Sequence, residues 1–171
     1  LIDSHWLFED DRKLVLYSSG GSIPSTDTIS ITSVVGLFEI VKDLYGGSKE
    51  FGETRPTEDS LNEHLRLCES FFDELLKQIP EYKQVFVSGK GRAGDYRVPA
   101  KNHLLFRPVG QRAFARAVQL LMSRNVALPT AVRRLRSAEM LIQKEPWHYI
   151  VWNPVDETMI TNKILLAEAQ L

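Results

Sequence analysis

Cysteine is almost absent from this sequence, in which Cys68 is the only one among 171 residues. A single cysteine excludes an internal disulfide and fits a reducing cytoplasm. Cys68 lies among helix-spaced apolar residues in LRLCESFF and is predicted to be an inert core thiol. Long apolar runs are also missing, because no stretch approaches the roughly 20 residues that cross a bilayer. We therefore expect a cytoplasmic protein that does not span a membrane.

Motifs for catalysis and metal binding are lacking as well. The four histidines (His5, His64, His103 and His148) do not pair at ligand spacing, so neither a metal site nor a cofactor is predicted. No serine lies in a nucleophile-elbow context. The stretch SGKGRAG, residues 88–94, has glycines and a cation but not the order of a phosphate-binding loop, which leaves a flexible loop or a weak anion site. No catalytic residue is assigned.

Charge is distributed very unevenly along the chain, although its net charge is only −1. Residues 1–89 carry a net charge of −8, residues 90–136 carry +10, and residues 137–171 carry −3. Asp95 is the only carboxylate in the basic segment, as we call residues 90–136. Such segregation is typical of an anion-binding face, or of two parts that pack together and neutralise each other.

Hydrophobic periodicity predicts a mainly α fold, a single domain over residues 1–171 with about five helices and a small C-terminal β-hairpin. After a short strand or helix end at 14–17 and a loop at 18–27, the first helix follows a cap at Thr32 or Ser33 and ends at Gly46 and Gly47. A polar linker, residues 48–56, leads to the clearest helix. Thr57 caps this helix and Pro80 stops it.

The helix at 57–80 has an apolar stripe long enough for the central helix of a bundle, formed by Leu61, Leu65, Cys68, Phe72, Leu75 and Ile79. A loop or ragged hairpin is predicted at 87–102, followed by helices at 108–124 and 129–143. WHYIVWNP and ETMIT are predicted to form the hairpin, with Trp147 and Trp152 covering the core. A last helix follows a cap at Thr161 or Asn162.

The helix at 108–124 belongs to FRPVGQRAFARAVQLLMSRN, residues 106–125, which has four arginines and no carboxylate. Arg112, Arg116 and Gln119 fall on a narrow stripe opposite its apolar side, where they could follow a phosphate backbone. The next helix adds Arg133, Arg134 and Arg136, so that the pair loosely resembles a helix-turn-helix. Candidate nucleic-acid-binding residues are therefore Arg107, Arg112, Arg116, Gln119, Arg133, Arg134 and Arg136.

Two alternatives compete with this DNA hypothesis. The arginines could form a solvated face, or they could pair with carboxylates of the acidic N-terminal half. Arg107, just before the first turn, could equally pair with a carboxylate inside the fold. The hypotheses predict different outcomes for a variant that lacks Arg112 and Arg116. If these arginines contact DNA, their removal barely changes thermal stability. If they pair with carboxylates inside the fold, their removal lowers the melting temperature.

The C-terminal stretch EPWHYIVWNPVDETMITNKILLAEAQL resembles the C-terminal region of DGQHR-domain proteins, a group that includes the DNA sulfur-modification DndB-like family. LFRPVGQRAFARAVQLL is similar to the segment before it, so the resemblance covers about residues 104–171. The Asp-Gly-Gln-His-Arg motif itself does not occur here. The resemblance implies that the chain is the C-terminal part of a longer protein, without any activity that needs this motif.

The resemblance further implies a bacterial DNA phosphorothioation system linked to defence, in which DndB-like members are associated with transcription regulation and DNA binding. We expect a DNA-associated regulatory or accessory module, with DNA and other proteins of the modification system as partners and no catalysis in this chain. The alternatives are a protein-interaction scaffold for the missing DGQHR portion and an enzyme fragment that acts on nucleic acid or a nucleotide.

Overall fold

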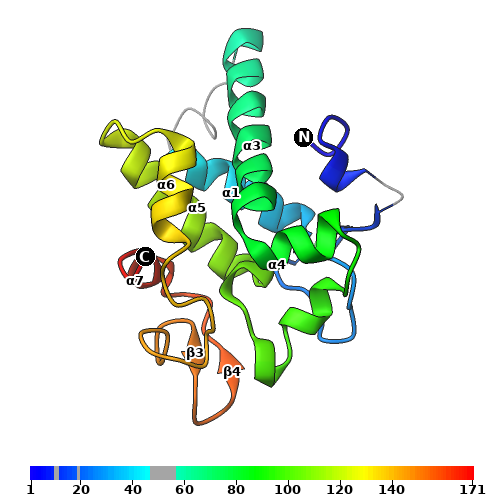
Figure 1. Cartoon of the computed structure of the whole chain (residues 1–171), viewed down its shortest axis with the longest axis vertical. Helices are drawn as coiled ribbons and strands as arrows, with labels where there is room; N and C mark the ends of the chain where they lie inside the picture. The colour runs from blue at the N-terminus through cyan, green and yellow to red at the C-terminus, as the bar shows by residue number, and fades with distance from the viewer. Residues whose placement is uncertain (10–11, 19, 47–56) are drawn as a thin grey trace.

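The fold was analysed in a computed structural model of the chain, which describes residues 1–9, 12–18, 20–46 and 57–171. It is mainly α, with a two-stranded antiparallel sheet near the C-terminus, as predicted (Figure 1). The predicted linker at 48–56 lies outside the described residues. Within the described residues, no helix has the length and apolar character needed to cross a membrane.

Helix α1, Val34–Leu44, begins where the sequence predicts, because the Ser33 hydroxyl accepts a hydrogen bond from the Gly36 amide at 3.0 Å. Just before it, strand β2 (Thr32–Ser33) pairs in parallel with strand β1 (Val15–Leu16). Gly46 follows the end of α1 with φ +71°, which glycine tolerates without steric strain.

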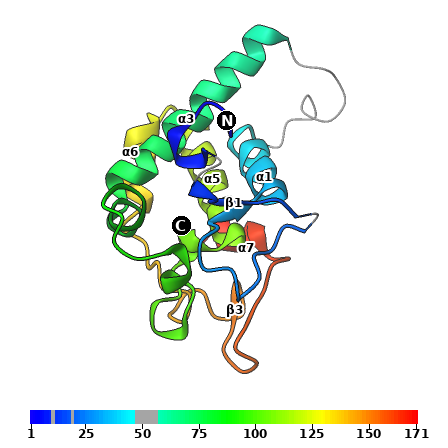
Figure 2. The same cartoon turned by 90° about the vertical axis from the view of Figure 1, so that its right-hand side faces the viewer.

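Helix α3, Glu58–Gln78, is capped by Thr57, whose hydroxyl accepts from the Ser60 amide at 3.2 Å. Cys68, Phe72 and Leu75 are buried, as the stripe predicts. The stripe does not reach the core along its whole length, because the first turns of α3 extend away from the other helices and leave Leu61 44% exposed (Figure 2).

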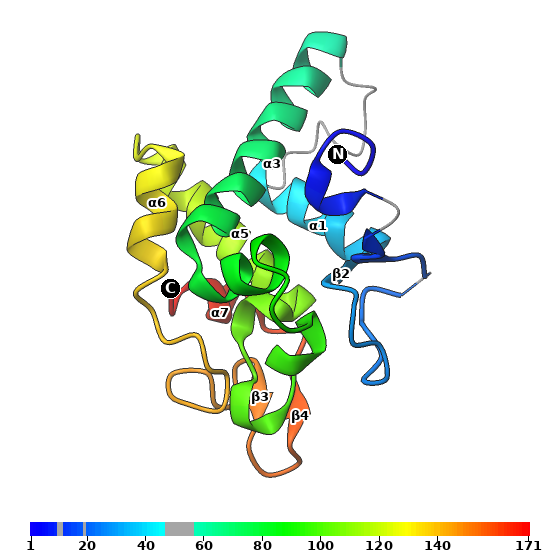
Figure 3. The same cartoon turned by 45° about the vertical axis from the view of Figure 1, so that its right-hand side comes forward.

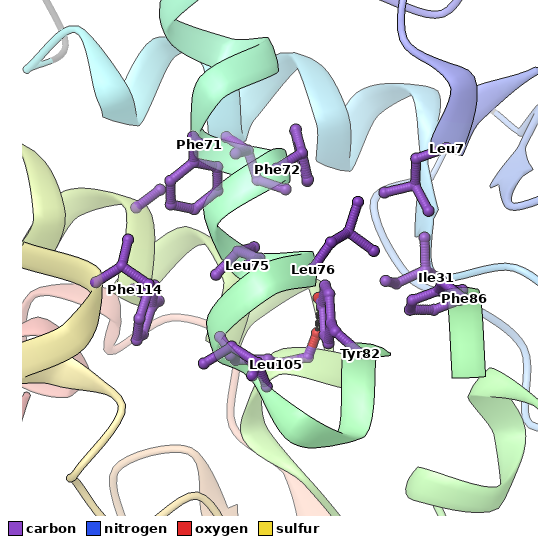
Figure 4. Close-up of a cluster of buried hydrophobic side chains, with 14 of the residues drawn as sticks. Leu7, Ile31, Phe71, Phe72, Leu75, Leu76, Tyr82, Phe86, Leu105 and Phe114 are labelled. Carbon is purple, nitrogen blue, oxygen red and sulfur yellow. Dashed lines mark hydrogen bonds between the residues drawn. The ribbon is translucent and has the colours of Figure 1, made fainter. Parts of the chain in front are cut away.

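Pro80 ends α3 and begins a short helix, α4 (Pro80–Tyr82), which continues as one π-helical turn over Lys83–Val87. The next residues contain no hairpin. They form short 3-10 turns, which are Ala93–Tyr96, Pro99–Lys101 and Leu104–Phe106. In the resulting core, the Tyr82 hydroxyl donates to the Leu105 carbonyl at 2.6 Å (Figure 4).

Helix α5, Pro108–Ser123, is the central helix of the fold. The sequence had assigned this central position to the helix at 57–80. Helix α5 packs against α1, against α6 (Leu128–Leu135) and against α7 (Ile164–Glu168), whereas α3 contacts only part of this set (Figures 1 and 3). Gly110 allows the first turn of α5 to approach Leu104, because a Cβ there would lie 2.1 Å from the Leu104 carbonyl oxygen.

Helix α6 ends at Leu135 and not at Gln143 as predicted. Residues 140–142 instead run beside 102–104, where Leu104 donates to the Met140 carbonyl at 2.7 Å and Ile142 donates to the Asn102 carbonyl at 2.9 Å. These contacts bury Ile142 completely. Residues 140–142 therefore provide hydrogen-bond partners for the backbone of residues 102–104. Helical spacing cannot reveal this pairing, because the two segments are far apart in the sequence.

The C-terminal hairpin consists of strands β3 (Trp152–Asn153) and β4 (Thr158–Met159). The predicted strand at HYIV is wrong, because the amides of Ile150, Val151 and Trp152 all donate to the Trp147 carbonyl and form a turn. Trp147 is fully buried, and Trp152 packs half-buried beside it, as predicted for rings that cover the core. Lys163 replaces the predicted caps of α7 and makes no side-chain cap.

Candidate functional site

The basic helix α5 directs two of its predicted site residues against acidic side chains of the same chain. The Arg112 guanidinium lies 2.7 Å from Asp43 and 2.9 Å from Glu39, both on α1. Arg116 lies 2.6 Å from Glu168 on α7 and 3.3 Å from Asp43. The pairing of the basic segment with the acidic half, which the sequence left as an alternative, is therefore present at these two positions. Contact of either arginine with DNA stays a prediction.

Asp43 is the centre of this network, which we call the Asp43 cluster (Asp43, Glu39, Arg112, Arg116 and Glu168). Its carboxylate is only 5% exposed and receives both arginines, which are themselves about one quarter to one third exposed. Burial alone lowers the pKa of Arg116, but hydrogen bonds to Glu168 and Asp43 outweigh it and raise the pKa. The cluster thus joins α1, α5 and α7 by charge.

Sequence reasoning did not identify Asp43, Glu39 or Glu168. One signal was present for Asp43, because it follows Ile40 by three residues and so borders the apolar stripe of its helix. A carboxylate at the border of an apolar stripe needs a cation if the neighbouring helix covers it. No comparable signal exists for Glu168, which meets Arg116 only through the placement of the short helix α7.

Two further predicted residues are also engaged in the fold. Arg107 donates from Nε to Asn102 Oδ1 at 2.8 Å and from Nη2 to the Arg97 carbonyl at 2.6 Å. These partners are neutral, so the carboxylate proposed for Arg107 is not among its contacts in the described residues. Gln119 is half-buried against the end of α1, where its amide nitrogen lies 2.9 Å from the position of a Cβ on Gly46.

The arginines of α6 are placed differently, because all three face outward. Arg133, Arg134 and Arg136 are exposed, while the opposite side of α6 buries Ala131, Val132 and Leu135. Arg133 reaches Thr130 at 3.4 Å within its own helix, and Arg136 donates to the Gln78 carbonyl at 3.3 Å. Across the described ranges, none of the three lies within 4 Å of a carboxylate.

Arg124 extends this outward-facing set, since it is exposed at the C-terminal end of α5, immediately before the turn into α6. Among the described side chains it has no carboxylate within 4 Å either. We call Arg124, Arg133, Arg134 and Arg136 the α6 arginine face. Its four charges are available to an external anion, and α6 lies on the outside of α5 and α3 (Figures 1 and 3).

Potential metal ligands and the single thiol are the other groups that bear on chemistry. No cluster of three His, Cys, Asp or Glu suited to a metal ion occurs in the part of the chain that the structure describes. The Cys68 thiol is 2% exposed, and burial raises its pKa to about 12, so it is the inert core thiol that was predicted.

Comparison of the chain with family models, curated proteins and solved structures found no match.

Proposed function

We propose that this chain is a non-catalytic, DNA-associated module that contacts the phosphate backbone through the α6 arginine face. One observation supports the proposal above all. The α6 arginine face presents four outward-facing guanidinium groups, at the end of α5 and along α6, that have no carboxylate partner among the described residues. Arginine forks suit phosphate oxygens, and exposed cations that release counterions on binding give sequence-independent affinity.

The proposal also takes up the resemblance of residues 104–171 to DGQHR-domain proteins. On that resemblance, the module is a regulatory or accessory part of a DndB-like protein in a cytoplasmic DNA phosphorothioation or related bacterial defence system. Two of the arginines first considered, Arg112 and Arg116, are assigned to the Asp43 cluster in this proposal. The α6 arginine face takes their place as the DNA contact.

Salt dependence of duplex binding tests the proposal. Arg133→Gln combined with Arg134→Gln should weaken binding to all duplex sequences alike and reduce the slope of log K against log salt by about 2, near one unit per lost phosphate contact. Fluorescence anisotropy with an unmodified duplex of mixed sequence measures the slope. A matched control replaces two other exposed cations, Lys77→Gln with Lys83→Gln, and should leave the slope unchanged. Equal effects of the two double variants would contradict the proposal.

A second candidate function is a scaffold that docks another part of its own longer protein. Exposed apolar side chains on α7 favour it, because Leu165 is 64% exposed and Leu166 is 53% exposed. Docking through such a surface would persist as salt rises, unlike binding through arginines. Changing both leucines to serine should abolish the docking and leave the salt slope for DNA intact.

A further inference from the structure

A pocket of about 420 Å³ lies between the loop at 21–23, the first turns of α1 and α5, and the residues around the end of β4. Its wall is mixed in character. The apolar part comes from Ile23, Val35, Val109 and Met159, and the charged part from Arg97, Arg107, Arg112 and Glu39. A volume in this range and a largely apolar wall with a few convergent charges are typical of small-molecule sites.

The charges on this wall do not balance. Arg112 and Glu39 neutralise each other at 2.9 Å, and Asp43 also pairs with Arg112. Arg97 and Arg107, by contrast, have no carboxylate within 4 Å in the described part of the chain. Two positive charges on the pocket wall are therefore left without a direct counter-ion.

Both guanidinium groups are held in place by neutral acceptors. Arg97 donates to the carbonyls of Ser30, at 2.7 Å, and Asp27. The Asp27 carboxylate instead accepts from the amides of Ile29 and Ser30, at 2.8 Å each. Arg107 is fixed by Asn102 and the Arg97 carbonyl. Each guanidinium uses only two of its five N–H groups in these bonds, so donors remain for a ligand.

The surroundings of the two arginines disfavour an unbalanced charge. Burial lowers the pKa of Arg97, although the charge of Asp27 partly opposes this, and burial together with the charge of Arg97 lowers the pKa of Arg107 to about 10. The N-terminal turns of α1 and α5 border the same pocket through Gly36 and Pro108, and α5 has no side-chain cap. Helix N-termini add positive potential, so an anion in the pocket would relieve repulsion from several sources.

We propose that this pocket binds a small organic phosphate monoester, with the phosphate between Arg97 and Arg107 and the organic body against Val35, Val109 and Met159. A dianionic phosphate matches the two guanidinium groups that lack a direct ion-pair partner among the described residues, whereas a carboxylate would pair with only one of them. Arginine forks bind phosphate oxygens in pairs, which fits two neighbouring guanidinium groups. The site goes beyond the proposed DNA contact and shares no residue with the α6 arginine face.

Isothermal titration of the whole chain with phenyl phosphate tests the proposal, at about pH 7.5, where a phosphomonoester is dianionic, and at constant ionic strength. Phenyl phosphate should bind one site more tightly than inorganic phosphate or benzoate, and phenol should not bind. Arg107→Gln should weaken binding by about tenfold or more, the effect of losing one charge-assisted hydrogen bond. Arg133→Gln, an arginine outside the pocket, is the matched control and should bind like the wild type.

Because Arg107→Gln also removes hydrogen bonds within the fold, a second variant keeps both arginines. Val35→Trp fills the pocket from a side chain that is 37% exposed, and it too should prevent binding. The proposal is overturned by a wild-type Kd for phenyl phosphate weaker than about 10 mM, by unchanged binding in Val35→Trp, or by equal binding of phenol or benzoate. The Arg133→Gln, Arg134→Gln variant separates this site from the DNA contact, because it should lose salt slope and keep phenyl phosphate binding.

Discussion

At the scale of single residues, Asp43 shows how one buried carboxylate decides what neighbouring arginines do. Its carboxylate is almost entirely enclosed, and the guanidinium groups of Arg112 and Arg116 both reach it. A guanidinium fork suits a phosphate and a carboxylate equally well, so the chemistry of the arginine does not choose its partner. The fold decides the partner, because α1 and α7, which carry the carboxylates, both pack against α5.

Removing these arginines should therefore destabilise the protein. Arg112→Ala combined with Arg116→Ala leaves Asp43 buried without a cation, and we expect a loss of about 3 kcal/mol in the free energy of unfolding, with a melting temperature several degrees lower. Thermal and urea unfolding measure both. Arg133→Ala with Arg134→Ala, on the exposed face of α6, should change stability by no more than about 0.5 kcal/mol per site. A double variant of α5 that melts like the wild type would refute the structural role of the pairs.

His103 gives a second residue-scale prediction, on pH. Its ring is 3% exposed and its Nδ1 accepts from the Leu105 amide at 3.2 Å. Burial lowers its pKa to about 4, although the charges of Glu81 and Glu139 oppose this. Between pH 6.5 and about 4 the unfolded chain holds a proton that the folded protein rejects, so stability should fall as the pH falls through this window.

The size of this effect at pH 5 should be roughly 2 kcal/mol relative to pH 7, from about 1.4 kcal/mol per pH unit. His103→Asn is the test, because an asparagine oxygen can still accept from the Leu105 amide but does not titrate in this range. Urea unfolding at the two pH values should show a smaller difference in the variant. An unchanged difference would assign the acid sensitivity to other groups.

At the scale of elements, α3 and α6 separate what local pattern predicts from what it misses. The cap, start and stop of α3 follow from Thr57 and Pro80, and its buried face follows from helical spacing. Its first turns nevertheless project from the body, and α6 ends eight residues early, because residues 140–142 pair with 102–104. Periodicity records which residues are apolar, but not whether a partner surface lies beside each of them.

Phe72 is the test of the α3 packing. It is 2% exposed, and its ring lies edge-on to the rings of Phe8 and Phe71, with centroids 4.7 Å and 5.3 Å away (Figure 4 shows this face of α3). Phe72→Ala should cost roughly 3–5 kcal/mol, since it leaves a cavity among rigid neighbours. Leu61→Ala on the exposed part of the same helix should cost less than about 1 kcal/mol. Chemical denaturation of both variants checks the contrast, and equal losses would contradict the arrangement.

At the scale of the whole molecule, two hydrophobic clusters share one helix. The larger cluster includes Phe114 of α5, while Ala113 belongs to the smaller cluster around Trp147. Met140 and Leu171 pack against both. Because adjacent residues of α5 belong to different clusters, the helix cannot lose one set of contacts without disturbing the other.

We therefore expect both clusters to unfold in one cooperative transition. In a Trp6→Phe, Trp152→Phe background, Trp147 fluorescence reports the smaller cluster and far-UV circular dichroism reports the helices. Their urea midpoints should coincide. A fluorescence midpoint clearly below the circular dichroism midpoint would show that the C-terminal cluster opens by itself.

The sequence by itself determined the helical class, the cap at Thr57, a cap at Thr32 or Ser33, and Pro108 at the start of α5. It also determined the buried Phe72 and Leu75 and the C-terminal turn at residues 153–157. Each depends on neighbours within a few residues, where hydrogen-bond geometry and side-chain spacing are local. The tertiary structure alone decided that α5 is central, that Arg112 and Arg116 meet Asp43, and that Arg97 and Arg107 line a pocket without a direct counter-ion among the described residues. Electrostatic partners are chosen by distance in space, and residues 43 and 112 come within 2.7 Å only after the helices have packed.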